Sequence, residues 1–260
     1  MPELPEVEFA SRRLERAVRE RLIVALRAVH PSVRRTLGDG AERVRGRRVR
    51  AVSRRGKHQI VTLDDGASLH VHFRMAGDWA IGTTADPERR HARAELDLDD
   101  GTRVTLVDPR ALSTVSLHPP GHSPLPELGP EAVDPSLDAA VLRAALVARR
   151  IAIKPALLDQ RVVAGLGNIY AAEALWHAGI SPRAAAASLG RARLARLVAG
   201  MRCALADATL DPGRYSRGEA AGRLYVYDRA GEPCDRCGSG IRRIVQGGRS
   251  TYFCPRCQRR

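Results

Sequence analysis

Hydrophobic and polar residues alternate with two different periods along this chain. In residues 2–22 the apolar positions recur at helical spacing and charged residues occupy the other faces, which predicts an amphipathic N-terminal helix. Short alternating runs follow from about residue 23 to 117, separated by Asp-Asp-Gly turns, and these predict an antiparallel sandwich or barrel. The clearest of these runs are residues 59–63, 68–73, 94–98 and 102–107.

The second half of the chain has a different pattern. Residues 119–136 contain six prolines, which is typical of a linker. After it, Ala/Leu/Arg-rich segments predict helices near residues 137–148, 155–160, 168–178 and 188–207. We therefore expect an N-terminal domain over 1–118, a linker over 119–136, a helical domain over 137–222 and a small cysteine-containing domain over 223–260.

Composition narrows the class of protein. The chain has 260 residues, 44% of them hydrophobic, which suits two domains and argues against disorder. No apolar run reaches membrane-spanning length, and the acidic start predicts no secretory signal. The net charge of +14 favours a polyanionic partner, above all nucleic acid. The alternative is a genome bias that fills the surface with arginine, since Lys57 and Lys154 are the only lysines.

Four of the five cysteines form two C-x-x-C pairs near the C-terminus. The pairs are Cys234 and Cys237, and Cys254 and Cys257. This spacing predicts one tetrahedral zinc ion held by four thiolates, with a structural role because no coordination position stays open. Two disulfides are the alternative, which the predicted absence of a secretory signal disfavours. The fifth, Cys203, is expected to be a buried small hydrophobe.

A glycine-rich segment precedes one predicted helix. Gly165 and Gly167 come directly before Asn168, the only asparagine of the chain. Free backbone N–H groups at a helix start can bind a phosphate, and Asn168 could cap the helix and donate to a phosphate oxygen. A plain capping turn is the alternative.

The N-terminus itself can carry chemistry. Removal of Met1 would leave Pro2 with a secondary amine, partly uncharged at neutral pH. Such an amine can attack an aldehyde-like sugar carbon and form an iminium ion. Glu3 and Glu6 lie nearby for proton transfer. The alternative is that these acids only favour the helix dipole.

Taken together, these features resemble the formamidopyrimidine-DNA glycosylase/endonuclease VIII family of base-excision repair enzymes, and are closer to its formamidopyrimidine type. The resemblance covers essentially the whole chain, in order. Its motifs are residues 1–8 (MPELPEVE), 54–57 (RRGK), 72–77 (HFRMAG), 108–110 (DPR), 153–155 (IKP), 165–170 (GLGNIY), 179–182 (GISP), 226–227 (VY), 231–234 (GEPC) and the loop at Arg249.

The resemblance implies an α+β multidomain fold. Its parts are an N-terminal helix with an antiparallel β-sandwich, a helical domain with a helix–two-turn–helix element, and a C-terminal β-hairpin zinc finger. It implies a monomeric, cytoplasmic and nucleoid-associated bacterial enzyme that binds damaged double-stranded DNA and one zinc ion, without membrane contact. Its reaction is expected to combine base excision with cleavage of the strand by β,δ-elimination.

Site residues are carried over from the matching motifs. Pro2 is expected to be the nucleophile on C1′ and Glu3 the proton donor and acceptor. Phosphates around the flipped nucleotide are expected to contact Lys57, Asn168 and Arg249, helped by His72, Tyr227 and Lys154. Met75 and Arg110 are expected to fill the gap left by the extruded base. His91 also matches the family, whereas His70 and His118 fall outside its motifs.

Several positions depart from the family pattern and leave the lesion open. Leu112 stands where a wedging Phe is usual, and Ala111 precedes it where the family has Arg. Arg74 replaces the Gly before Met75, and Arg93 stands where His is common. The segment at about 209–225 is expected to be shorter than the loop that closes over 8-oxoguanine.

Three readings follow from these departures. The leading one is a bifunctional glycosylase and AP lyase acting on an oxidised, ring-opened or bulkier base. A glycosylase repurposed for bulky or cross-linked adducts is a variant of it. The alternatives are a lesion-binding protein of this fold without efficient turnover, and a generic zinc-ribbon nucleic-acid binder. The opposite-base preference is not determined by the sequence.

Overall fold

The computed structural model describes residues 2–210 and 224–259 and divides into two compact units. Residues 1–2 and 6–126 form the first unit, and residues 3–5 and 127–260 form the second. The division falls inside the predicted linker. The domain boundaries at 118, 136 and 222 stay predictions, and most of the predicted short loop at 209–225 lies outside the described residues.

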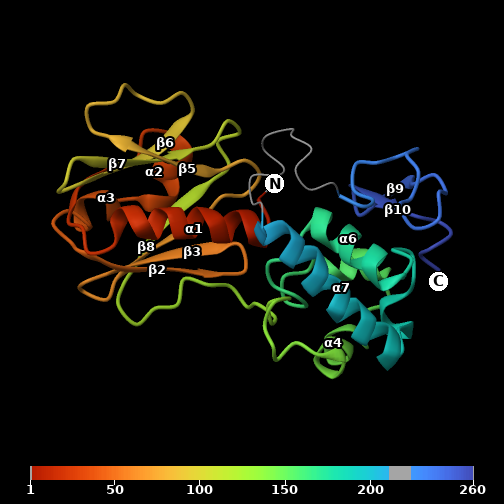
Figure 1. The fold of residues 1–260 in the computed structure, drawn as a ribbon. Helices are drawn as coiled ribbons and strands as arrows, with labels where there is room; N and C mark the ends of the chain where they lie inside the picture. Colours follow the sequence, from red (N-terminus) through yellow and green to blue (C-terminus); the bar gives the residue numbers. More distant parts are fainter. Residues whose placement is uncertain (1, 211–223, 260) are drawn as a thin grey trace. The chain divides into compact units, whose positions relative to one another are not determined.

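The first unit is a β-sandwich accompanied by helices (Figure 1). One sheet has the order β1-β6-β7-β5 and the other β2-β3-β4-β8, and every pairing is antiparallel. The elements are α1 (Leu4–Val18), β1 (Ile23–Arg27), α2 (Pro31–Leu37), α3 (Gly40–Arg43), β2 (Val49–Arg55), β3 (His58–Leu63), β4 (Ser68–His72), β5 (Asp78–Thr83), β6 (Ala92–Leu98), β7 (Thr102–Val107) and β8 (Thr114–His118). The predicted alternating runs are therefore confirmed as strands.

The core of the first unit lies between the two sheets. Alternate residues of the strands point inward, and α1 adds Val7, Leu14 and Val18 to the same buried cluster. The predicted helix over 2–22 is shorter in the structure, because Glu20 adopts a left-handed φ of 60° that ends the helical path.

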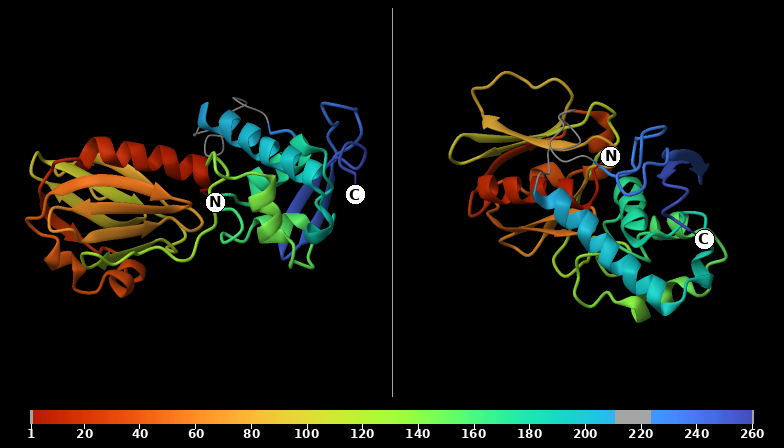
Figure 2. Two further views of the ribbon diagram at one scale, coloured as in Figure 1. Left: turned by 90° about the horizontal axis from the view of Figure 1, so that it is seen from below. Right: turned by 45° about the vertical axis from the view of Figure 1, so that its right-hand side comes forward.

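The second unit is helical and ends in a β-hairpin (Figures 1 and 2). Its elements are α4 (Ala139–Leu146), α5 (Ile153–Leu157), α6 (Asn168–Ala178), η1 (Ala186–Ser188), α7 (Arg191–Leu210), β9 (Arg242–Gln246) and β10 (Arg249–Phe253). Helix α6 is buried on nearly every face, and it packs against α7. Leu4 is part of this second core.

Cys203 corrects a sequence expectation. It lies on α7 and is exposed, although the surrounding Ala/Leu pattern predicted burial. The apolar residues of α7 that do face the core include Leu197, Met201 and Leu205, which are spaced one helical turn apart on another side of the helix. In the described residues, no helix is long and apolar enough to cross a membrane.

Candidate functional site

The carboxylate of Glu3 is held at the N-terminus of helix α6. The backbone N–H of Ile169 donates to its Oε1 at 2.9 Å and that of Tyr170 to its Oε2 at 3.3 Å. Glu3 is only 1% exposed. A negative group is favoured at this position by the helix dipole and by the unsatisfied N–H groups of the first turn. The side chain next to Pro2 is therefore fixed in place.

The glycine-rich segment makes room for this contact. A Cβ on Gly167 would overlap the Glu3 carboxyl group, and one on Gly165 would overlap Leu4. Gly165 also adopts a φ of +87°, and its carbonyl accepts a hydrogen bond of 3.1 Å from the Leu4 N–H. The two glycines thus leave space for residues 3 and 4 of the chain. The N–H groups of the first turn of α6 bind Glu3, whereas the sequence suggested that they bind a phosphate.

Asn168 does not cap helix α6, which corrects the capping hypothesis. Gly167 is the N-cap residue and makes no side-chain capping hydrogen bond of its own. The Asn168 amide instead donates to the Tyr227 hydroxyl at 3.3 Å and to the Ser250 carbonyl at 3.0 Å. Because Glu3 satisfies the helix start, Asn168 is available to join α6 to the hairpin strand β10.

Lys154 connects to the same group of residues. Its ammonium donates to the Asn168 Oδ1, to the Thr251 hydroxyl at 2.8 Å and to the Ser250 carbonyl at 3.2 Å. Lys154 is 1% exposed. Burial, opposed by Glu3 and reinforced by Arg249, lowers its pKa to about 8. Lys154, Asn168, Tyr227 and the start of β10 at Arg249 are thus brought together in the second unit.

The segment that carries Tyr227 is anchored by a residue that the sequence analysis did not single out. The buried carboxylate of Glu173 on α6 accepts the backbone N–H groups of Tyr225, Val226 and Tyr227 at 2.8–3.0 Å. The spacing of Glu173 within an Ala-rich helix gives no hint of this, since its partners follow more than fifty positions later.

In the first unit, the His72 ring is neutral and its remaining N–H can donate a hydrogen bond. The backbone N–H of Arg74 donates to its Nδ1 at 2.9 Å, so the ring proton lies on Nε2. Burial, followed by His58 and Arg74, lowers the pKa of His72 to about 3. Lys57 lies in the turn between β2 and β3, 8% exposed.

The void-filling candidates project from two loops of the first unit. Met75 is 38% exposed and Leu112 is 45% exposed, while Arg110 is also exposed. The two loops are tied together by Ser113, whose hydroxyl donates to the Phe73 carbonyl at 3.1 Å. A Cβ on Gly77 would overlap this hydroxyl, which explains the glycine after the Met75 motif.

Asp108 fixes the backbone of the second loop. Its buried carboxylate accepts the N–H groups of Arg110 at 2.9 Å, Leu112 at 2.7 Å and Ser113 at 2.8 Å. Burial alone would raise the pKa of Asp108, but the hydrogen bonds, led by those from Ser113, lower it. His91 lies beside this loop, and its carbonyl accepts the Asp108 N–H at 3.0 Å.

Two of the departures from the family pattern, Arg74 and Ala111, fall on strained backbone. Arg74 has a φ of 55° and Ala111 a φ of 54°, the left-handed region that glycine adopts without a steric cost. Arg93 donates from Nε to the Asp108 carbonyl at 2.6 Å, so it supports the loop that carries Leu112.

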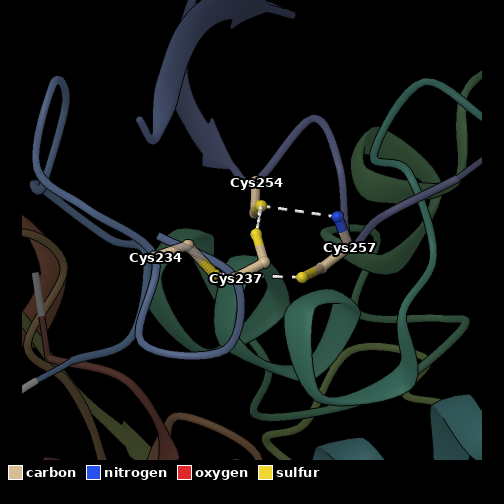
Figure 3. Close-up of side chains that lie close together, drawn as sticks. All are labelled: Cys234, Cys237, Cys254 and Cys257. Carbon is tan, nitrogen blue, oxygen red and sulfur yellow. Dashed lines mark hydrogen bonds between the residues drawn. The ribbon is translucent and has the colours of Figure 1, made fainter. Parts of the chain in front are cut away.

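The four predicted cysteines converge at the base of the hairpin (Figure 3). Their sulfurs all lie within 4.8 Å of one another, with 3.5 Å between Cys237 and Cys254 and 4.0 Å between Cys234 and Cys257. Sulfurs bound tetrahedrally to one zinc ion at about 2.3 Å are about 3.8 Å apart. The geometry therefore fits a zinc site made of four thiolates. A zinc ion bound there would have a structural role and would hold β9 and β10 together.

Comparison with known proteins matches every part of the chain. The formamidopyrimidine-DNA glycosylase N-terminal domain matches residues 1–115, the formamidopyrimidine-DNA glycosylase H2TH domain 128–214, and the zinc finger found in FPG and IleRS 231–260. Curated relatives named formamidopyrimidine-DNA glycosylase include that of Acidiphilium cryptum, 39% identical with all of both chains covered. That of Paracoccus denitrificans is 41% identical over 99% of this chain and all of the relative.

Solved structures agree with these relatives. A complex of a Lactococcus lactis FPG mutant with Fapy-dG-containing DNA has a TM-score of 0.91 at 33% identity, and all of both chains are covered. MutM in complex with carbocyclic 8-oxo-G-containing DNA gives the same values. The α+β fold predicted from the sequence is confirmed, and so is the zinc finger. The chain belongs to the formamidopyrimidine-DNA glycosylase family, and it is a base-excision repair DNA glycosylase with AP lyase activity.

Proposed function

We propose that the reaction proceeds through a Schiff base on Pro2, exposed as the first residue after removal of Met1. The amine nitrogen loses its proton and attacks C1′ of the damaged nucleotide, the glycosidic bond breaks, and the base leaves with a proton. Protonation of O4′ then breaks the C1′–O4′ bond, which opens the sugar ring and leaves an iminium between C1′ and the proline nitrogen. The resulting iminium draws electrons from C2′, so loss of a C2′ proton expels the 3′ phosphate, and a second elimination expels the 5′ phosphate.

The placement of Glu3 is the observation that supports this mechanism most. Its carboxylate adjoins Pro2 in the chain and is held by two backbone N–H groups of α6. A fixed carboxylate beside the attacking amine can move the proton that each step requires. We assign Glu3 this role.

We further propose that Lys57, His72, Asn168, Arg249 and Tyr227 contact phosphates of the flipped nucleotide and its neighbours. The neutral His72 donates through Nε2, and Asn168 is oriented for its contact by Lys154 and Ser250. In this assignment the buried Lys154 is a positioning residue. Met75, Arg110 and Leu112 enter the gap in the duplex.

Borohydride trapping on a duplex with an abasic site tests the mechanism. Untagged wild type should form a covalent adduct, and Pro2→Gly with Glu3→Gln should form none. The matched control is Glu6→Gln, which changes an acid of the same segment outside the proposed steps. An undiminished adduct with the double variant would refute the Schiff-base assignment, and mass spectrometry verifies that Met1 is absent.

The relatives support a proposal for the substrate class. Their names and complexes concern formamidopyrimidine, Fapy-dG, abasic-site and carbocyclic 8-oxo-G DNA, and we propose damaged duplex DNA with ring-opened purines as the substrate here. Leucine at 112 and arginine at 74 differ beside the lesion. Strand nicking is measured on duplexes that contain formamidopyrimidine, 8-oxoguanine, 5-hydroxyuracil or a bulky N7 adduct. This panel identifies the lesion that the enzyme cleaves. Exclusive cleavage of the bulky adduct would replace this proposal.

We also propose that the enzyme acts as a monomer on chromosomal DNA in the bacterial cytoplasm. The organisms of the curated relatives and the DNA in the similar complexes support this. Sedimentation of the protein alone and with one lesion duplex tests the stoichiometry, and a 2:1 complex on a single lesion would contradict it.

A further inference from the structure

One face of sheet β2-β3-β4-β8 points away from the sandwich core and collects histidines. Antiparallel pairing places His58 opposite His72, and His118 opposite Ser68, with His70 between them on β4. Because side chains alternate along a strand, these residues share the outer face. All four histidines are half-buried there.

The rings form a continuous row. Ring centroids are 4.7 Å apart between His72 and His58, 5.0 Å between His58 and His70, and 6.0 Å between His70 and His118. His122 stacks beyond, 5.6 Å from His118. The Nδ1 of His58 and the Nε2 of His70 share a hydrogen bond of 2.8 Å. The row starts at a residue assigned to phosphate contact and extends across the sheet.

This sheet contains no acidic residue in any of its four strands, all of which lie in the described part of the chain. The other sheet differs, since Glu95 and Asp97 on β6 pair with Arg27 at 2.8 Å each. The outer face of β2-β3-β4-β8 instead carries Arg55, which is paired with His58 across the strands. Its charges are positive and its other polar groups are hydroxyls and imidazoles.

Among the described residues, the charged groups that shift the pKa of the row's histidines are basic side chains and other histidines. Burial lowers the pKa of His58 and of His70 to about 4, and the groups that add to this are histidines, Arg74 and, for His58, Lys57. His118 is shifted in the same direction by burial and by His122. The imidazoles are therefore neutral at pH 7. In the His58–His70 hydrogen bond one ring donates its only N–H to the other, and the accepting ring keeps its own N–H to donate.

We propose that this outer face, centred on His70 and His118, is a second contact surface for the phosphate backbone of the DNA duplex. It is continuous with the phosphate contacts at Lys57 and His72, and this inference rests on the proposed function for that reason. A polyanion supplies the negative charge that the face lacks, and donors without competing carboxylates suit phosphate oxygens.

Binding at this face has a consequence for protons. A phosphate next to an imidazole favours its charged form, so the pKa of His70 rises when DNA binds. A group whose pKa is higher in the complex takes up protons on binding, so affinity increases as the pH falls. The double variant His70→Asn/His118→Asn should lose this dependence while keeping uncharged donors.

The experiment uses the full-length, zinc-loaded protein and a duplex with an uncleavable abasic-site analogue. Affinity is measured between pH 5.5 and 8 for wild type, for the double variant and for His30→Asn. His30 caps α2 away from the row, and asparagine can replace its capping acceptor. Loss of two contacts should weaken binding about 3- to 10-fold per contact at the acidic end, and the control should match wild type.

Two further measurements make the test decisive. The effect should be present with a duplex of about 25 base pairs and reduced with one of about 10, which spans a single turn. Ring resonances of His70 in the wild-type protein should shift with DNA and titrate at higher pH in the complex, and this requires no variant. Unchanged resonances with equal affinities at all pH values would show a purely structural row and overturn the proposal. Because borohydride trapping reports on Pro2 separately, failure of the row and failure of the mechanism are distinguishable.

Discussion

The void-filling candidates of the first unit and the buried candidates of the second unit are held in opposite ways. In the second unit the side chains themselves are buried and hydrogen-bonded, as with Glu3 on α6 and Lys154 on Asn168. In the first unit the backbone of a loop is fixed through Asp108, while Met75 and Leu112 remain exposed.

This difference matches the two tasks. Proton transfer and phosphate contact need donors and acceptors in set positions, and buried hydrogen bonds supply them. A side chain that enters a base stack needs an accurate starting point and freedom at its tip. A rigid loop with an exposed apolar end meets that need.

The largest expected effect is on the second unit, through its metal. Cys237→Ser should abolish zinc binding, loosen β9 and β10, and release Ser250 and Thr251 from Lys154. DNA affinity should fall at least about 10-fold while the sandwich stays folded. Zinc analysis measures the metal content, equilibrium binding measures the DNA affinity, and near-UV circular dichroism reports whether the sandwich stays folded. Cys203→Ser on α7 is the matched control and should keep zinc. Full affinity without zinc would contradict the prediction.

The next effect concerns the first unit. Asp108→Asn turns an acceptor of four hydrogen bonds into a partial donor, which should cost about 2–3 kcal/mol of folding stability. Since the folded pKa is lowered, this stability is present above the unfolded pKa and is lost as pH falls through the folded pKa. Urea denaturation at several pH values measures it.

Asp100→Asn is the control for that change. It removes an exposed turn carboxylate that accepts the Thr102 N–H, so its effect should be much smaller. Equal destabilisation by the two variants would show that the loop is not specially held by Asp108.

A third prediction separates charge from packing at Lys154, whose pKa is about 8 in the folded protein. DNA affinity should fall as pH rises through 8, because the ammonium beside Asn168 loses its charge. Folding stability should change the other way between about 8 and 10.5, because the unfolded state binds more protons in that window. Lys154→Arg keeps its charge, so its DNA affinity should not fall as pH rises through 8. If wild type and Lys154→Arg showed the same pH dependence of DNA affinity, Lys154 would not be the group responsible for it.

The smallest effect is expected at the strained loop positions. Arg74→Gly relieves a left-handed residue at φ 55° and should raise stability by about 0.5–1 kcal/mol. Ala111→Gly, at φ 54°, is the parallel case. Thermal denaturation compares them with wild type. A clear loss of stability in both variants would mean that relief of backbone strain is not the main effect of these substitutions.

The sequence by itself determined the local elements and the metal site. Helix α6 begins and ends at the predicted residues 168 and 178, and the four cysteines converge as their spacing predicted. Hydrophobic periodicity and short ligand spacings are local properties, so they can be read along the chain. The family resemblance assigned Pro2, Glu3 and the phosphate contacts before any geometry was available.

Tertiary structure decided which groups these elements bring together. The sequence suggested that Asn168 caps the start of α6. In the fold the Glu3 carboxylate takes this position, 166 residues before the Ile169 N–H that it accepts. The strand pairing of β1 with β6 and the row from His72 to His118 likewise join residues far apart in the chain. Such contacts depend on how separate elements pack, and no periodicity within a single element encodes the partner on another.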